Sequence, residues 1–270
     1  MNLSVAIITF NEETNIARTL KSVIEVADEI VIVDSGSTDL TLDIAKDFGP
    51  KLKIFAEEWK GFAAQKNSAI EKCSGQWILS LDADEELSDG LRSEIAQLIQ
   101  LEHVTVVPDG TPGTGEPCTV FSIARRNMFL GRWMRHGGFW PDRKIRLFQR
   151  GDALFEERPV HESIHASGPV GELQFPLHHH SYPTLNGYIE HMNRYSSLGA
   201  ETAVARGITN RNVFEFLLNV ILRPKFTFLY NYVIRGGFLD GREGLLQHLY
   251  HAVYVSWKYA KAWEMGRGRK

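Results

Sequence analysis

Three carboxylates follow one apolar run in the stretch Ser80–Glu85, which reads SLDADE. Side chains alternate along an extended segment, so Asp82 and Asp84 are expected to point to the same side. Two carboxylates held together repel each other unless a cation lies between them. Mg²⁺ or Mn²⁺ takes such oxygen ligands and completes its shell with substrate phosphates. The spacing therefore predicts a divalent metal on Asp82 and Asp84; the alternative is an acidic turn that caps the next helix.

Two neighbouring patterns need separate interpretations. By the same alternation, Glu85 points away from Asp84 and is expected only to begin the following helix. His178, His179 and His180 together resemble a metal cluster, but consecutive residues rarely ligate one ion. We therefore expect one of them, His179, to approach the metal or a diphosphate.

The elements that position these residues alternate between strand and helix. Continuous apolar runs predict strands at 4–10, 29–35, 51–57 and 76–82, and amphipathic runs predict helices at 11–27, 37–49, 62–73 and 87–101. Strands that are apolar on both faces are typical of a mostly parallel sheet covered by helices on both sides. The predicted fold class is therefore α/β.

Polar residues gather where these strands end. They are Thr9, Asn11 and Glu12 after the first strand, Asp34 after the second, and Asp82 and Asp84 after the fourth. Ligands of such sheets bind beyond the carboxyl ends of the strands, so these ends are expected to form one rim. Alone, Asp34 is equally suited to a nucleotide base or ribose and to capping the next helix. Neither GxGxxG nor GxxxxGK[ST] occurs, which disfavours dinucleotide binding and P-loop chemistry.

Composition separates two parts of the chain. Its 270 residues are 43% hydrophobic and 23% charged, which is ordinary for a folded soluble protein. We expect a catalytic domain at 1–185, divided into halves at 1–105 and 106–185, and a helical extension at 186–270. From Arg206 to Lys270 there are 11 Lys and Arg but only 4 Asp and Glu, while the preceding part is acidic.

The basic extension has apolar runs of about ten residues, shorter than the ~20 needed to span a bilayer. Cations interleaved with Phe, Tyr and Trp suit a helix lying on an anionic membrane surface. The alternatives are helices that pack on the catalytic domain or that form a homo-oligomer. Nucleic acid is a poor partner because the body is acidic and no recognition motif appears. The N-terminus MNLSVAIITF has no basic region before its apolar run, so it is expected to be a first strand and not a signal peptide.

Several motifs in order resemble a known enzyme family. The segments VAIITFNEETNI, ADEIVIVDSGSTDLT and GFAAQKNSAIEKCSGQWILSLDADEEL resemble the nucleotide-sugar half of family 2 glycosyltransferases, which have a GT-A fold. Further on, RRNMFLGRWMRHGGFWPDRKIRLFQRG, FEERPVHESI and GFLDGREG resemble a bacterial subgroup, the lipopolysaccharide core β-glucosyltransferases and their relatives. The resemblance spans nearly the whole chain and is far more specific than one DxD motif.

The resemblance implies a set of donor-binding residues. Thr9, Asn11 and Glu12 would line the nucleotide base pocket, Asp34 would contact the base, and Lys66 would face the nucleotide or its phosphates. Asp82, Ala83 and Asp84 would hold the ribose and the metal that bridges the diphosphate.

The acceptor side needs a general base, because a hydroxyl must lose its proton as it attacks the sugar. Glu162 in RPVHES is the candidate that the resemblance favours, and the alternative is a surface Glu paired with an arginine. His161 beside it points to the opposite face of an extended segment. Arg143 and Arg146 suit phosphate or are solvated strand charges. Trp140 suits stacking on a sugar ring or core packing.

The implied function is inverting, metal-dependent transfer of a hexose. The expected donor is a nucleoside diphosphate sugar, with UDP-glucose favoured. The expected acceptor is a lipopolysaccharide core or lipid-linked glycan, and the expected location is peripheral on the inner face of the cytoplasmic membrane. One alternative is a nucleotidyltransferase that makes an activated sugar, although TFNEETN lacks the Gly-rich basic loop of such enzymes. The other is a non-catalytic membrane-associated protein that keeps the fold.

Overall fold

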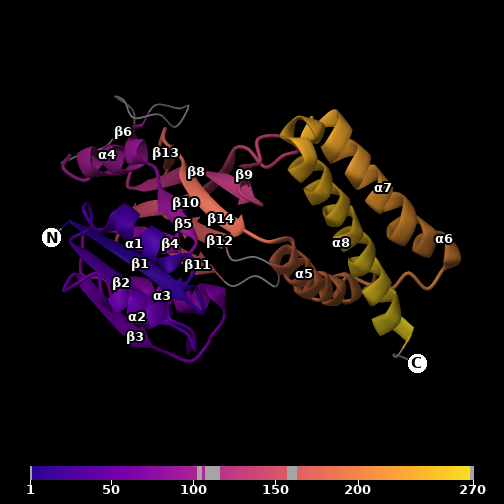
Figure 1. Cartoon of the computed structure of the whole chain (residues 1–270), viewed down its shortest axis with the longest axis horizontal. Coiled ribbons are helices and arrows are strands. Elements are labelled where there is room, and N and C mark those ends of the chain that lie inside the picture. The colour runs from indigo at the N-terminus through magenta and orange to yellow at the C-terminus, as the bar shows by residue number, and fades with distance from the viewer. Residues whose placement is uncertain (1, 102–104, 107–115, 157–162, 268–270) are drawn as a thin grey trace. The chain divides into compact units, whose positions relative to one another are not determined.

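The computed structural model describes residues 2–101, 105–106, 116–156 and 163–267 (Figure 1). The chain forms two compact units, the first made of residues 1–125 and 142–180 and the second of 126–141 and 181–270. Sequence patterns place 126–141 in the acceptor half of the catalytic domain, whereas the structure assigns it to the second unit. The reason is packing, because Phe129 and Met134 form a buried cluster with Tyr188.

Four parallel strands form one half of the sheet in the first unit. They are β1 (Leu3–Thr9), β2 (Glu29–Asp34), β3 (Leu52–Ala56) and β4 (Trp77–Asp82), in the order β3-β2-β1-β4. Thr9 pairs with Asp34 across β1 and β2, and Ile8 pairs with Asp82 across β1 and β4. Because β1, β2 and β4 end in register, their polar ends lie at one edge of the sheet. This arrangement confirms the rim predicted from the sequence.

The second half of the sheet is mixed. Strand β10 (Asp142–Gln149) is antiparallel to β4, and the order continues through β8 (Val120–Phe129), β14 (Leu177–Tyr182) and β5 (Glu85–Leu87). Strand β13 (Val170–Glu172) lies parallel to β8. Strand β9 (Arg132–Trp133) pairs antiparallel with the last residues of β8. Two small ladders stand apart: β11 (Ala153–Glu156) with β12 (Ser163–Ala166), and β6 (Thr105–Val106) with β7 (Glu116–Pro117).

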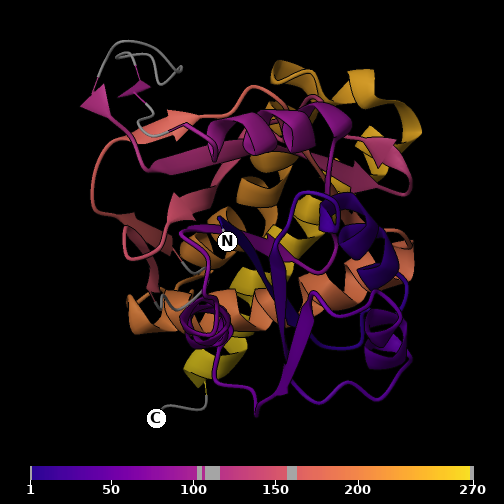
Figure 2. The same ribbon diagram turned by 90° about the vertical axis from the view of Figure 1, so that its left-hand side faces the viewer.

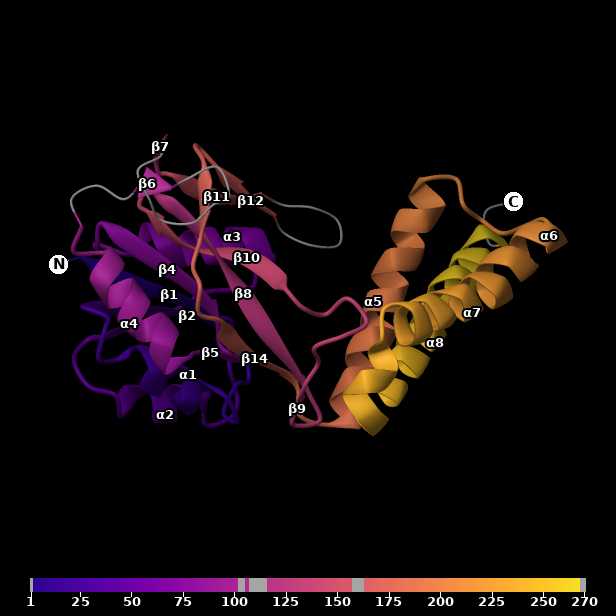
Figure 3. The same cartoon turned by 90° about the horizontal axis from the view of Figure 1, so that it is seen from above.

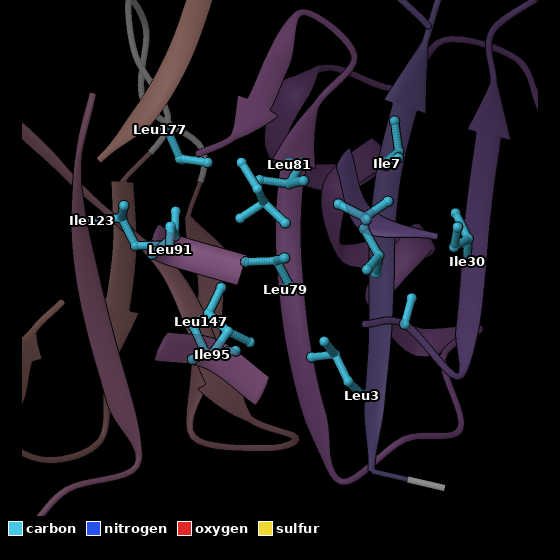
Figure 4. Packing of buried hydrophobic residues seen from close by; sticks show 14 of the residues in the cluster. Leu3, Ile7, Ile30, Leu79, Leu81, Leu91, Ile95, Ile123, Leu147 and Leu177 are labelled. Atoms are coloured by element: carbon cyan, nitrogen blue, oxygen red, sulfur yellow. The ribbon is translucent and has the colours of Figure 1, made fainter. Parts of the chain in front are cut away.

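Helices cover both faces of the parallel strands (Figure 3). One face packs against α1 (Ile16–Val23), α2 (Thr41–Lys46) and α4 (Asp89–Leu98), and the other packs against α3 (Phe62–Glu71) and β11. Figure 4 shows the first of these layers, in which Leu3 and Ile7 of β1 lie near Leu79 of β4 and Ile95 of α4 belongs to the same cluster. The α/β prediction is therefore confirmed, with an antiparallel half added to the parallel one.

The first helices are shorter than the sequence predicts. Helix α1 begins at Ile16 and not at residue 11, because Asn11 has a φ of 56° and the chain turns before the helix starts. Helix α2 begins at Thr41 and not at residue 37, because Gly36 and Ser37 form a turn around Asp34. Because both helices start late, the segments before them are irregular backbone at the sheet edge, where the polar residues gather.

The second unit is mainly helical. Its elements are α5 (Leu185–Ala205), α6 (Val213–Phe216), a π-helical stretch Leu217–Leu222, α7 (Arg223–Phe228), a second π-helical stretch Leu229–Ile234, a 3₁₀ turn Gly237–Asp240 and α8 (Gly241–Arg267). Helix α8 contacts both α5 and α7, as the orange and yellow ribbons show (Figure 1 and Figure 2). Within the described ranges, no helix combines the length and apolar character needed to cross a bilayer.

An exposed apolar stripe runs along the helical segment 213–234. We define it by its members, each more than one-third exposed: Val213, Phe214, Leu217, Leu218, Ile221, Leu222, Phe226, Leu229, Tyr230, Val233 and Ile234. They recur every four residues, as five adjacent pairs and the single residue Phe226, whereas an α-helix repeats every 3.6. The π-helical turns take more residues each, so the alternation of α and π turns keeps the pairs aligned. Asn219 and Pro224, between the pairs, are buried.

Candidate active site

Asp34 organises the turn that follows β2. Its carboxylate, 1% exposed, accepts hydrogen bonds from the backbone N–H groups of Gly36 and Ser37, both at 2.9 Å, and from the Thr9 hydroxyl at 2.9 Å. Gly36 has a φ of 90°, which glycine adopts without strain. Asp34 therefore shapes the rim between β1 and β2 and does not cap α2, which begins at Thr41.

Asn11 and Glu12 continue this rim. The Asn11 side-chain oxygen accepts from the Thr38 N–H at 2.8 Å, and the Glu12 N–H donates to the Thr41 hydroxyl at 2.7 Å. Burial, together with the nearby charges of Asp84 and Asp82, raises the pKa of Glu12 to about 7, against the opposing hydrogen bond from Asn15. Negative charge is therefore concentrated between the ends of β1 and β4, which is where a cation would be favoured.

Asp82 lies between two buried cations. Lys66 Nζ is 2.7 Å from Oδ1, and Arg146 Nη2 is 2.6 Å from Oδ2. Burial alone would raise the pKa of Asp82, but the attraction of Lys66 and Arg146 outweighs it and holds the pKa well below its usual range. Lys66 therefore lies at the predicted site, where it contacts the Asp82 carboxylate. Asp82 is fixed in its charged form.

Glu85 belongs to the same buried network, which corrects the prediction that it only begins a helix. Its carboxylate is fully buried, and Oε1 accepts from Arg146 at 2.7 Å and Arg125 at 3.2 Å. Arg125 also bonds Asp142 at 2.6 Å. The alternation rule fails because the chain turns at residues 83–84, so β5 restarts at Glu85 with its side chain inside.

Asp84 faces His179 across the β4–β5 turn. Asp84 Oδ2 lies 3.3 Å from His179 Nε2, and the pairing of β14 with β5 sets this contact. Burial would raise the pKa of Asp84, but His179 lowers it, while Asp84 raises the pKa of His179 against the effect of burial. The pair therefore favours a carboxylate beside an imidazolium when no other cation is present.

The three predicted metal ligands are not equivalent in the structure. Asp84 and His179 lie together, whereas both oxygens of Asp82 are bonded to cations. Across the described part of the chain, no group of three His, Cys, Asp or Glu side chains is placed to hold a metal ion. A carboxylate and an imidazole nitrogen remain, a set that fits a metal whose other ligands are water and substrate phosphate. Ala83 joins the two aspartates, and its carbonyl accepts from the Thr19 hydroxyl at 2.6 Å.

The remaining predicted residues divide between this network and other parts of the chain. Arg143 pairs with Glu172 on β13 at 2.9 Å, so it is not simply a solvated strand charge, and its phosphate-binding role stays a prediction. Arg146 is 4% exposed within the Asp82–Glu85 network, so it too is not a solvated strand charge. Trp140 belongs to the second unit, where its ring packs edge-on against Trp133. His161 and Glu162 lie outside the described residues.

Sequence reasoning missed three contributors to this edge of the sheet. Arg125 and Asp142 pair across β8 and β10 beside Glu85, and His180 Nε2 bonds Glu86 at 2.8 Å on the outer side of β5. No local pattern identifies them, since their partners come from distant strands. The one available signal was the run of three histidines, in which alternation along β14 separates His179 from His180.

Comparison with known proteins identifies related chains. Residues 4–162 match the sequence model of Glycosyl transferase family 2. The chain is 31% identical over 267 residues to the lipopolysaccharide core biosynthesis glycosyltransferase LpsC of Rhizobium meliloti, covering 97% of this chain and 92% of that protein. It is 30% identical to an uncharacterized glycosyltransferase of Rickettsia typhi, covering 97% and 87% of the two chains.

Two solved structures match this chain at low identity. The mannosyltransferase PcManGT from Pyrobaculum calidifontis, in complex with GDP-Man and Mn²⁺, is 16% identical, with a TM-score of 0.48 over 97% of this chain and 86% of that one. S. aureus TarS 1–349 in complex with UDP is also 16% identical, with a TM-score of 0.46 over 100% and 92%.

Proposed function

We propose a specific reaction for this chain on the premise that it belongs to glycosyl transferase family 2 and is a glycosyltransferase with a GT-A fold. The proposed reaction moves a hexose from a nucleoside diphosphate sugar to a hydroxyl of a glycolipid, with inversion at the anomeric carbon. We favour UDP-glucose as donor. The acceptor proposal, a lipopolysaccharide core or lipid-linked glycan, is supported by the name of the Rhizobium relative, a lipopolysaccharide core biosynthesis glycosyltransferase.

One observation carries the proposal: Asp84 faces His179 at 3.3 Å beside an Asp82 that Lys66 and Arg146 hold in its charged form. Asp84 and His179 would bind Mg²⁺ or Mn²⁺, which when bound offsets negative charge on the leaving diphosphate. Asp34, Asn11 and the backbone turn at Gly36 form the rim on which the nucleoside would lie.

The chemistry requires one group beyond this rim. The acceptor oxygen forms a bond to the anomeric carbon while the bond from that carbon to the phosphate oxygen breaks. The electron pair leaves with the nucleoside diphosphate, and the acceptor proton passes to a general base. We propose Glu162 for this base, and His161, its neighbour, for a supporting acceptor contact.

A metal-dependent donor-binding experiment tests the proposal. Wild type should bind a UDP-sugar with Mn²⁺ and release UDP slowly, whereas Asp84→Asn should lose metal-dependent binding while keeping its melting temperature. Asp89→Asn is the matched control, because Asp89 lies nearby on α4 with a side chain that is 94% exposed. Equal donor binding by wild type and Asp84→Asn would refute the site, and failure of both to bind any nucleotide sugar would favour the non-catalytic alternative. Release of pyrophosphate from a nucleoside triphosphate and a sugar phosphate would favour the nucleotidyltransferase.

The second unit supports a proposal about location. The apolar stripe is long and exposed, and segment 211–239 carries Arg211, Arg223, Lys225 and Arg235 against Glu215 alone. Exposed apolar surface of this extent marks an interaction site, and its positive charge complements anionic lipid. We propose that the stripe docks on the inner face of the cytoplasmic membrane, so that the protein binds peripherally.

A groove beside the stripe supports the same partner. It has a volume of about 510 Å³, lies between α7 and α8, and shares Ile221 and Leu229 with the stripe. Leu249, Ala252 and Val253 of α8 form its other wall. Such a surface accepts acyl chains more readily than polar ligands, because each apolar side chain that leaves water contributes about 1.5–3 kcal/mol.

Flotation with vesicles tests the location. Wild type should float with vesicles that contain phosphatidylglycerol, and Phe214→Glu combined with Ile234→Glu should remain at the bottom of the gradient. Leu154→Glu is the control, because Leu154 is 53% exposed in the first unit. Equal flotation of the double variant and wild type would contradict membrane docking. A concentration-dependent dimer that the double variant abolishes would instead assign the stripe to a second copy of the chain.

A further inference from the structure

Two arginines in the second unit stack on one tryptophan. The guanidinium carbons of Arg126 and Arg135 lie 4.5 and 4.7 Å from the centre of the Trp133 ring. The two carbons are therefore no more than about 9 Å apart. Like charges held this close repel each other, so the arrangement favours an anion between or beside them.

Neither guanidinium has a carboxylate partner among the described residues. Two buried donors at the same place are also unmatched: Arg126 Nε and Trp133 Nε1 have no hydrogen-bond partner in the part of the chain that the structure describes. Buried N–H groups in folded proteins are nearly always bonded, and the exceptions commonly mark a missing ligand. The unmatched donors here therefore call for an acceptor beyond the described residues, and an anionic ligand would supply one.

The loop that carries Arg135 is built to hold its shape. Asp240, 2% exposed, accepts from the backbone N–H of Arg135 at 3.1 Å and of His136 at 2.8 Å, and it pairs with His136 Nδ1 at 2.7 Å. The ring of His248 fills the space beside Gly137 and Gly237, where a Cβ atom would lie within 2.2 Å of it. The cluster therefore rests on a fixed loop and not on freely moving surface side chains.

A third arginine adjoins the loop. The Arg235 guanidinium lies against Gly138, where a Cβ atom would be 2.2 Å from Nη1. Arg235 directly follows Ile234, the last member of the apolar stripe. We call Arg126, Arg135 and Arg235 the arginine cluster. Apolar surface that ends at concentrated positive charge matches an amphiphile whose polar end is anionic.

We propose that the arginine cluster binds a phosphate group carried by the glycolipid acceptor. Guanidinium forks match phosphate oxygens in pairs, and the Trp133 N–H supplies a further donor. The donor diphosphate is assigned above to the first unit, where Asp84 faces His179, so the cluster is available to the other substrate. This inference rests on the proposed function in naming the phosphate's carrier as the acceptor and in assigning the donor to the first unit.

Binding of lipid A tests the site without any sugar transfer. The probes are bisphosphorylated lipid A and the same lipid A with its phosphates removed, each in neutral detergent micelles. Wild type should bind the phosphorylated form at least tenfold more tightly, because hydrogen bonds to charged groups are strong. Arg126→Gln combined with Arg135→Gln should lose this preference. Arg267→Gln, which removes an arginine stacked 4.7 Å from Trp263, should keep it.

Each other outcome has a defined meaning. If wild type binds both lipids equally, or if the double variant keeps the preference, the phosphate site is wrong. If inorganic phosphate or phosphatidylglycerol micelles compete as well as lipid A, the acceptor assignment is wrong. Should the double variant fail to fold, Arg135→Gln alone, at an exposed position, gives the same comparison. Failure of donor binding in wild type refutes the proposed function separately, because the lipid assay contains no donor.

Discussion

Replacing Glu85 by Gln should destabilise the first unit more than any other single-charge change at the rim. Gln keeps the shape but exchanges one carboxylate oxygen for an NH₂ group. Oε1 faces Arg125 and Arg146, and Oε2 faces the backbone N–H of Asp82 at 3.0 Å. Every one of these neighbours is a donor, so the NH₂ group meets a donor in either orientation. The substitution therefore removes a charge and at least one hydrogen bond together.

The magnitude follows from burial. Removing one partner of a buried ion pair costs about 3–5 kcal/mol, and Gln retains one acceptor, so we expect about 3 kcal/mol. For a chain of this size that loss lowers the melting temperature by about 6–12 °C. Glu86→Gln is the matched control one residue away, because Glu86 is 32% exposed and pairs with His180. Such a partly exposed pair contributes about 1 kcal/mol or less.

Thermal unfolding followed by circular dichroism measures both variants against wild type. Donor affinity measured in parallel should also fall for Glu85→Gln. Arg146 is held by the carboxylates of Asp82 and Glu85, and the substitution removes the second of these. If Glu85→Gln melts within 2 °C of wild type (below the ~6 °C lower bound), or no lower than Glu86→Gln, the network does not stabilise this edge of the sheet.

Three further predictions concern the donor rim, the base and acid stability. Asp34→Asn should weaken donor binding about tenfold by calorimetry, since one amide cannot accept from Thr9, Gly36 and Ser37 together; unchanged affinity would remove Asp34 from the donor site. Glu162→Gln should keep donor affinity while transfer slows by about 10²–10⁴-fold; loss of donor binding would make it a structural residue. Burial alone would raise the pKa of Glu29, but hydrogen bonds from Lys53, Ser4 and Ser74 outweigh it and lower the pKa to about 2 from 4.5. Its stabilisation is therefore present above pH 4.5 and lost as the pH falls toward 2. It amounts to about 3 kcal/mol, so Glu29→Gln should flatten the acid limb of urea unfolding while Glu25→Gln leaves it intact.

The parallel half of the fold could be predicted because its signal is local. Strand β2 is buried at every position, and its interior, Ile30–Val33, is apolar throughout and differs from the amphipathic segments around it. Because parallel strands pair in register, Thr9, Asp34 and Asp82 lie at one edge of the sheet, and no tertiary contact is needed to predict this. The antiparallel half was harder to recognise, because its two main strands, β8 and β10, carry several charged residues and pair with strands distant in sequence.

The ion network could not be predicted because its partners are distant in sequence. Arg146 lies 64 residues from Asp82 and 61 from Glu85. Alternation predicts the direction of a side chain only while the strand continues, and a two-residue turn at 83–84 resets it. The wrong direction predicted for Glu85 comes from this turn, whereas the burial of Arg146 depends on its distant partners. The DxD motif is visible in the sequence, but the different contacts of its two aspartates depend on the tertiary structure.

The four-residue repeat of the apolar stripe restricts how segment 213–234 can vary in length. One added residue would rotate everything beyond it by about a quarter of a turn and carry Val233 and Ile234 off the exposed side. Four added residues would extend the stripe by one pair and leave it straight. Homologous helices with the same alternation of α and π turns should therefore differ in length by multiples of four residues, which is the length of one repeat of the stripe.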